Sequence, residues 1–203
     1  MNKTKNETAK KAALDFHEFQ KPGKLEIRAT KPLANQSDLA KAYSPGVAEA
    51  CLEIKKNNKK SSSYTSKSNL VAVISNGTAV LGLGNIGALA AKPVMEGKAV
   101  LFKKFAGIDC FDLEIDEENP EKLAKIITTL EPTFGAINLE DIKAPDWISV
   151  EKICKNKMRI PVFHDDQHGT AIVVGAALVN SLRLVKKKMS EIKVVCPGGG
   201  AAG

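Results

Sequence analysis

Two short apolar runs, each closely followed by a pair of acidic residues, constrain the fold of this chain more than any other feature. The first run leads into Glu140-Asp141, and the second precedes Asp165-Asp166. An apolar run of this length, bounded by Pro or Gly, is typical of a buried strand. In open α/β sheets, ligands collect at the carboxyl ends of the strands. The four carboxylates are therefore expected to face one crevice.

Carboxylates that converge in one crevice repel each other unless a cation lies between them. A site built only from oxygen ligands favours a hard divalent ion, Mg²⁺ or Mn²⁺. The sequence therefore predicts a divalent metal site assembled from two segments that lie far apart along the chain.

Strands alternate with helices from residue 70 onward, which predicts an α/β fold with a largely parallel sheet in three layers. Expected strands cover residues 70–75, 79–81, 135–139 and 160–163, with a hairpin turn at Asn76-Gly77 between the first two. Expected helices cover residues 7–19, 87–105, 120–130, 150–157 and 167–187. Another helical stretch opens at residue 37, is broken at residues 44–46 and restarts there toward residue 54. Residues 55–69 are rich in Ser and Lys and are expected to form an exposed loop.

Gly198, Gly200 and Gly203 have the G-x-G-x-x-G spacing of a dinucleotide-binding turn, and they follow an expected strand at residues 193–197. Such a turn aims a helix N-terminus at the pyrophosphate. We therefore divide the chain into a substrate and metal domain, residues 1–160, and the incomplete start of a Rossmann-type NAD(P)-binding domain, residues 161–203. The chain is expected to be truncated there.

A second set of glycines, Gly82, Gly84 and Gly87, has the same spacing after an expected strand. Dinucleotide-binding units also place an acidic residue about 20 positions later, at the end of the next strand, and none is found here. We interpret this loop as a tight turn beside the substrate rather than a dinucleotide site.

Three further residue types suggest chemistry, each with a plainer alternative. Lys98 lies in an apolar stretch, where burial would lower its pKa toward the range of a general base; a solvated lysine is equally compatible with the sequence. Tyr43 lies where a helix must break and is either a packing residue or a proton donor. His164 and His168 have a spacing that can bind zinc, but their place beside the acidic pair favours orienting the carboxylates.

The net charge of +7 comes mostly from dispersed lysines, with three arginines and few aromatic residues. This pattern is typical of solvated surfaces and argues against nucleic-acid binding. Four irregularly spaced cysteines without a C-x-x-C pair fit a reducing cytoplasm. We expect a cytoplasmic protein with no membrane partner, because no apolar run looks long enough to span a bilayer.

Taken together, the motifs resemble those of the bacterial NAD(P)-dependent malic enzymes, from about residue 14 to the last residue. Five motifs occur in the family's order: AYSPGVA at 42–48, VLGLGNIG at 80–87, EGKAVLF at 96–102, NLED at 138–141 and FHDDQHGT at 163–170. The resemblance implies oxidative decarboxylation of (S)-malate to pyruvate and CO₂, with reduction of NAD or NADP. It also implies that Glu140, Asp141 and Asp166 bind Mg²⁺ or Mn²⁺.

The same resemblance implies roles for three other side chains. Lys98 matches the general base that takes the proton from the C2 hydroxyl of malate. Tyr43 matches the acid that protonates enolpyruvate at C3, and Asp165 matches a neighbour of the base that assists proton transfer. Because the chain stops within the glycine motif, we expect it to be inactive alone. It would act as a homo-oligomer or with a partner that supplies the cofactor domain; alternatively, it is an inactive remnant that binds only metal and dicarboxylate.

Overall fold

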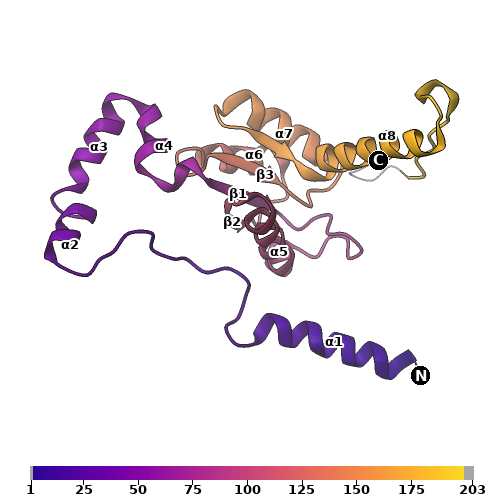
Figure 1. Cartoon of the computed structure of the whole chain (residues 1–203), viewed down its shortest axis with the longest axis horizontal. Helices are drawn as coiled ribbons and strands as arrows, with labels where there is room; N and C mark the ends of the chain where they lie inside the picture. Colours follow the sequence, from indigo (N-terminus) through magenta and orange to yellow (C-terminus); the bar gives the residue numbers. More distant parts are fainter. Residues whose placement is uncertain (1, 199–203) are drawn as a thin grey trace.

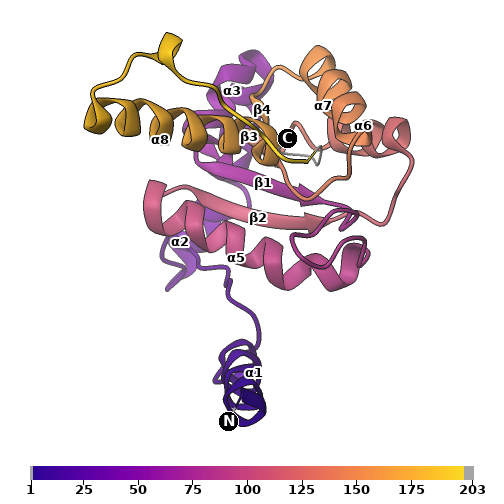
Figure 2. The ribbon, with the colours of Figure 1, turned by 90° about the vertical axis from the view of Figure 1, so that its right-hand side faces the viewer.

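The computed structural model describes residues 2–198, with side chains from residue 6 onward. At its centre is a four-stranded sheet in the order β2-β1-β3-β4, in which every pair is parallel (Figure 2). The strands are β1 (Leu70–Ser75), β2 (Asp109–Glu114), β3 (Ala136–Leu139) and β4 (Val162–His164). The predicted α/β class with a largely parallel sheet is confirmed.

Helices cover both faces of the sheet and complete three layers (Figure 2). One face packs against α5 (Ala88–Ala106) through a core that includes Val73 and Met95. The other face packs against α6 (Pro120–Thr129) and α7 (Asp146–Lys157). The side chains of β1 alternate between the two cores, as a strand buried on both faces requires, with Ile74 on the α6 and α7 side.

Local sequence explains where the covering helices begin and end. The side chain of Asn119 accepts a hydrogen bond from the Lys122 amide at 2.9 Å and caps α6, and Pro120 occupies the first turn. The α5 helix ends at Gly107, which adopts a left-handed conformation that glycine reaches without a Cβ clash. Both helices were predicted from the sequence and are confirmed to within about two residues.

The strand order reverses between β1 and β3, and this reversal creates the crevice that positions the site. From β1 the chain crosses to β2 on one side, and then passes β1 to reach β3 and β4 on the other. The connections on the two sides therefore diverge above the carboxyl ends of β1 and β3. In sheets of this type, that is the place where ligands bind.

Residues 2–56 form an N-terminal arm that projects from the sheet (Figure 1). It contains α1 (Asn2–Glu18), α2 (Gln36–Ala42) and α3 (Val47–Lys56), and neither α2 nor α3 has a buried residue. The arm is anchored at Lys24, whose amide donates to Glu96 and whose ammonium donates to the Pro93 carbonyl, both at 2.8 Å. Short helical turns then replace the loop expected over residues 55–69: η1 (Asn58–Lys60), α4 (Ser61–Tyr64) and η2 (Ser66–Ser68).

The C-terminal part also leaves the sheet (Figure 1). After β4 comes a π-helical turn, η3 (Asp165–Gly169), followed by α8 (Thr170–Val185) and η4 (Met189–Glu191). The helical stretch Asp165–Val185 is long and apolar enough to cross a membrane, with a mean hydropathy of 1.4, so the expectation that no segment qualifies was wrong. A single helix of this kind is weak evidence for insertion, because helices of soluble proteins meet the same criteria.

Two expected strands do not form. Val80 pairs only with Gly84 in an isolated bridge, and the predicted hairpin is a turn that packs against the start of α5. Gly77 has a positive φ of 68°, and a Cβ there would lie 2.2 Å from the Gly87 carbonyl oxygen. Only glycine therefore allows the two backbone segments to approach this closely. Residues 193–197 belong to no helix or strand, and Val195 is exposed.

One strand, β2, was not predicted, because Asp109, Asp112 and Glu114 interrupt its apolar pattern. Of the glycines expected to bind the cofactor, Gly198 lies at the end of the described residues with a φ of 107°. Gly200 and Gly203 lie outside them. Because β4 pairs with β3, the sheet continues past residue 160. The division of the chain into two domains at that residue stays a prediction.

Candidate metal and catalytic site

The segment after β3 is held in the crevice by hydrogen bonds to the chain that leaves β1. The Glu140 amide donates to the Ile74 carbonyl at 2.9 Å, and the Asp141 carbonyl accepts from the Ala79 amide at 3.0 Å. Asp141 has a positive φ of 53°, a conformation that costs a non-glycine residue free energy and is tolerated best by Asp and Asn. Both acidic side chains are largely buried as a result.

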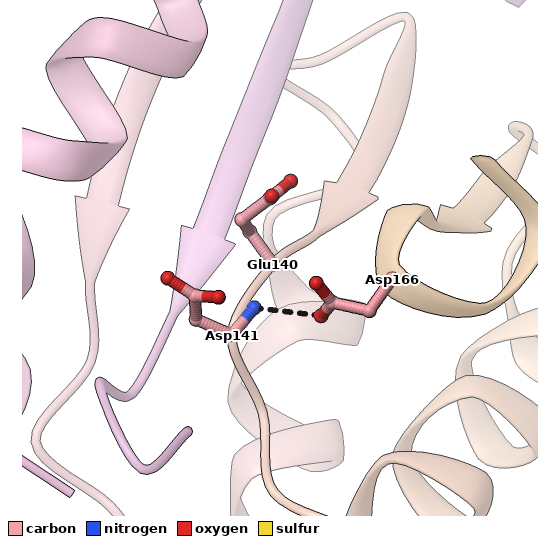
Figure 3. Close-up of side chains that lie close together, drawn as sticks. All are labelled: Glu140, Asp141 and Asp166. Carbon is pink, nitrogen blue, oxygen red and sulfur yellow. Dashed lines mark hydrogen bonds between the residues drawn. The ribbon is translucent and has the colours of Figure 1, made fainter. Parts of the chain in front are cut away.

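Asp166 reaches the same crevice from η3 (Figure 3). Its Oδ2 accepts a hydrogen bond from the Asp141 amide at 3.0 Å, which joins the two segments directly. One carboxylate oxygen from each of Glu140, Asp141 and Asp166 lies within 4.8 Å of the others. The structure thus brings together the three residues that the sequence nominated as metal ligands.

Lys98 extends from α5 into this cluster and is the cation nearest to the carboxylates. Its Nζ lies 3.1 Å from Glu140 and 2.5 Å from Asp165 Oδ2, and its side chain is 20% exposed. Two of the three expected catalytic residues, Lys98 and Asp165, therefore contact each other beside the expected metal ligands. This arrangement permits proton exchange between the ammonium and a carboxylate.

The charges of the cluster shift its acid–base behaviour. Burial raises the pKa of Glu140 to about 7, and the nearby Asp165 and Asp166 add to this against the opposing effect of Lys98. Burial also raises the pKa of Asp141 to about 6, with Asp166 the strongest like-charged neighbour. A cation bound beside these carboxylates would offset the free-energy cost of ionising them, and this is the environment expected of a metal site.

Lys98 itself does not titrate in the direction expected from the sequence. Burial alone would lower its pKa, as we expected, but the ion pairs with Asp165 and Glu140 outweigh burial and hold the pKa above its ordinary value. The sequence could not supply this result, because the two carboxylates come from segments 42 and 67 residues away.

The donor set fits a hard divalent cation. It contains only carboxylate oxygens, and Mg²⁺ holds such ligands at about 2.0–2.1 Å, so that opposite ligands lie roughly 4.2 Å apart. The three carboxylate oxygens lie within 4.8 Å of one another, which is close to this spacing. Glu140, Asp141 and Asp166 are the residues that would hold the ion.

Asn138 supports the cluster and was not assigned a role from the sequence. It is almost fully buried in β3, and its Nδ2 donates to Glu140 Oε2 at 2.9 Å, which fixes the orientation of that carboxylate. The available signal was a polar residue inside an otherwise apolar strand, since buried polar side chains are retained when they have a partner.

Tyr43, the third expected catalytic residue, is not part of this cluster. It forms the C-cap of α2 in the N-terminal arm, its side chain is 72% exposed, and α2 projects away from the sheet (Figure 1). The arm of the same chain therefore does not deliver this hydroxyl to the carboxylates in the structure. The catalytic role of Tyr43 stays a prediction.

Comparison with known proteins identifies the family to which this fold and cluster belong. Residues 22–125, about half of the chain, match the family described as the malic enzyme N-terminal domain. The chain belongs to the malic enzyme family. The resemblance drawn from its five motifs is thereby confirmed.

Similarity to malic enzymes extends over nearly the whole chain. The NADP-dependent malic enzyme of Haemophilus influenzae is 65% identical over 196 residues, which are 97% of this chain and 26% of that protein. The NAD-dependent malic enzyme of Rhizobium meliloti is 64% identical over 190 residues, 94% of this chain and 25% of the relative.

A crystal structure of malic enzyme from Pyrococcus horikoshii has a TM-score of 0.92 at 50% identity, covering 96% of this chain and 46% of that one. The fold is therefore that of solved malic enzymes. The chain spans about a quarter of the length of these two curated relatives.

Proposed function

We propose that the chain carries the substrate and metal site for oxidative decarboxylation of (S)-malate to pyruvate and CO₂, coupled to reduction of NAD or NADP. The observation that carries this proposal is the contact between Lys98 and the carboxylate cluster at the switch point of the sheet. The names of the similar enzymes, some NAD-dependent and some NADP-dependent, support both alternatives for the cofactor.

The chemistry that a divalent cation held by Glu140, Asp141 and Asp166 supplies is stabilisation of negative charge on the substrate oxygen, while NAD(P)⁺ supplies the hydride acceptor. Lys98 accepts the proton of the C2 hydroxyl. For this step Lys98 must first be neutral. Its pKa falls when the charge of Glu140 is neutralised, because one of the two ion pairs that hold the pKa up is then lost.

Asp165 receives or returns that proton through its 2.5 Å contact with the Lys98 ammonium. Protonation at C3 is assigned to Tyr43, which its own chain holds outside the cluster. We therefore propose a homo-oligomer in which the arm of a second copy brings Tyr43 to the site. Exposed apolar side chains on the arm, among them Phe16 and Leu52, support such packing.

Gly198, Gly200 and Gly203 are proposed to contact the pyrophosphate of the cofactor. A partner polypeptide that supplies the remaining cofactor domain is the alternative to a homo-oligomer. We propose a cytoplasmic location, consistent with four cysteines free of disulfide bonds.

The test combines metal binding with turnover. We expect saturable Mn²⁺ binding by the purified chain in isothermal titration calorimetry, and malate-dependent formation of NAD(P)H with Mn²⁺ once a polypeptide that supplies the remaining cofactor domain is added. Glu140→Gln and Asp166→Asn are expected to weaken Mn²⁺ binding by about 100-fold or more and to abolish turnover. Glu53→Gln, on the exposed arm, is the matched control for metal binding and leaves it unchanged. Mn²⁺ and malate binding without turnover would identify a non-catalytic binding protein, and absence of Mn²⁺ binding would overturn the proposal.

A further inference from the structure

Helix α7 contacts both histidines that flank the acidic pair. The ring of Trp147 stacks on that of His164 with centroids 4.8 Å apart and planes at 28°. Four residues further along α7, Glu151 Oε1 lies 2.7 Å from His168 Nε2. Residues four apart lie on one face of a helix, and the two histidines are also four apart, so the contacts form two successive rungs. We call these four residues the α7 ladder.

The lower rung is buried and charged. Glu151 is largely buried, and Lys155, one turn further along α7, pairs with it at 2.8 Å. Burial alone would raise the pKa of Glu151, but the hydrogen bonds from Lys155 and His168 outweigh it and lower the pKa. An ionised acceptor makes the stronger kind of hydrogen bond, so the rung holds the His168 ring firmly against α7.

The upper rung places an unpaired nitrogen beside Asp166. His164 is fully buried, and its Nδ1 accepts a hydrogen bond from the Gln167 amide at 3.4 Å. The neutral ring therefore carries its proton on Nε2. Within residues 2–198 this buried nitrogen has no hydrogen-bond partner, and it lies 3.8 Å from Asp166 Oδ2. A movement of less than about 1 Å would form a hydrogen bond of ordinary length.

Asp166 Oδ2 already accepts a hydrogen bond from the Asp141 amide. A donor on each side of this oxygen would hold it in place and leave Oδ1 to face the cation. From this geometry we propose that Trp147, Glu151, His164 and His168 are positioning residues. Through the two rungs they hold the η3 turn so that Asp166 presents one oxygen to the divalent cation. This inference rests on the proposed metal site and concerns how tightly that site binds its ion.

The proposal predicts a loss of metal affinity that fold stability does not explain. Partners that orient a metal ligand change affinity by about 10–100-fold when removed. We expect Glu151→Ala and His168→Ala to weaken Mn²⁺ binding within this range, as measured by electron paramagnetic resonance of free Mn²⁺. We expect Glu151→Gln and His164→Gln, which retain the size and a hydrogen-bonding group of the original side chains, to keep most of the wild-type affinity for Mn²⁺.

Lys152→Met is the matched control. It removes an exposed charge from α7 that is not part of either rung, and we expect Mn²⁺ affinity within about twofold of the wild-type chain. Thermal unfolding without metal is measured for every variant. Should an alanine variant fail to fold, a double-mutant cycle between Glu151→Leu and His168→Phe, which remove the hydrogen bond and keep most of the side-chain volume, replaces it. Non-additive losses in Mn²⁺ affinity are expected.

Two outcomes would overturn separate statements. If the wild-type chain does not bind Mn²⁺, the proposed function fails and this inference with it. If the wild-type chain binds Mn²⁺ and loses it on Asp166→Asn, while the ladder variants fold and bind as tightly as wild type, the metal site stands and the positioning role is wrong. A lowered unfolding temperature with unchanged affinity counts as the second outcome.

Discussion

The crevice and the N-terminal arm differ in how their functional side chains are held. In the crevice, three separate segments are joined by short polar contacts, because Lys98 pairs with Glu140 and Asp166 accepts a hydrogen bond from the Asp141 amide. In the arm, Tyr43 and the apolar side chains around it face solvent. A single chain therefore brings the proposed base and the proposed metal ligands together, whereas it holds the proposed acid, Tyr43, away from them.

The largest effect is expected from apolar truncation in the two regions. Leu123 is fully buried beneath the sheet, and we expect Leu123→Ala to lower the free energy of unfolding by about 2–5 kcal/mol. Phe16 is 70% exposed on α1, and we expect Phe16→Ala to change it by less than about 0.5 kcal/mol. Urea denaturation at low protein concentration measures both. A similar loss for both variants would show that the arm packs on its own chain.

Removal of a ligand charge should have opposite effects on metal binding and on stability. We expect Glu140→Gln to weaken Mn²⁺ binding by about 100-fold or more, beyond the loss caused by removing an outer partner. Without metal, the same variant should unfold at a higher temperature at pH 8, because a buried carboxylate with a raised pKa is no longer ionised. Differential scanning calorimetry with and without Mn²⁺ tests both signs, and a lower unfolding temperature without metal would contradict the account.

The raised carboxyl pKa values predict a pH dependence. Glu140 titrates near 7 and Asp141 near 6 in the folded chain, above the ordinary values of 4.5 and 3.8. As pH rises through these windows the unfolded chain loses its protons first, so these two groups make the metal-free protein less stable from about pH 4 to 7.

Cation binding needs the ionised groups, so Mn²⁺ affinity should rise by about tenfold or more between pH 5.5 and 7.5. Calorimetric titration at several pH values measures this rise. Glu140→Gln is the control in which the rise is reduced, and a flat profile in the wild-type chain would exclude these carboxylates as ligands.

The smallest effect compares two helix caps of the same chemistry. Asn119 caps α6 and Asn35 caps α2, each by accepting an amide hydrogen bond at 2.9 Å. Loss of such a cap costs about 1 kcal/mol. We expect Asn119→Ala to lower the global free energy of unfolding by this amount. We expect Asn35→Ala to leave it unchanged and only increase hydrogen exchange in α2, since the arm opens locally. Equal global losses would place the arm within the cooperative unit.

Much of the central sheet and the cluster followed from local sequence. The apolar runs before Glu140 and Asp165 form β3 and β4, and the order of parallel strands brings their ends together. These features were predictable because buried strands show their pattern within a few residues and sheet topology places ligands at one edge. The apolar surroundings of Lys98 left its role open, and only the family resemblance nominated it as the general base; the structure places it beside the carboxylates.

The remaining features depended on long-range contacts. Strand β2 carries Asp112 and Glu114, which look incompatible with burial until Lys92 of α5 is placed beside them at 2.6 and 3.2 Å. Val80 was expected in a strand, but the approach of Gly77 to Gly87 turns the chain away. The upward pKa shift of Lys98 and the exposure of Tyr43 likewise depend on groups distant in sequence.

The crossing of β1 by the chain between β2 and β3 has a consequence for the order of events during folding. The crevice forms only when β3 and η3 have packed beside segments that lie tens of residues earlier in the chain. Lys98 and Asp165, which contact each other there, are 67 residues apart. Contacts this distant close slowly, because the intervening loop must first lose its freedom. A refolding chain should therefore acquire its ability to bind a divalent ion last. The late appearance of metal binding during refolding would then report that the sheet and the η3 turn are both formed.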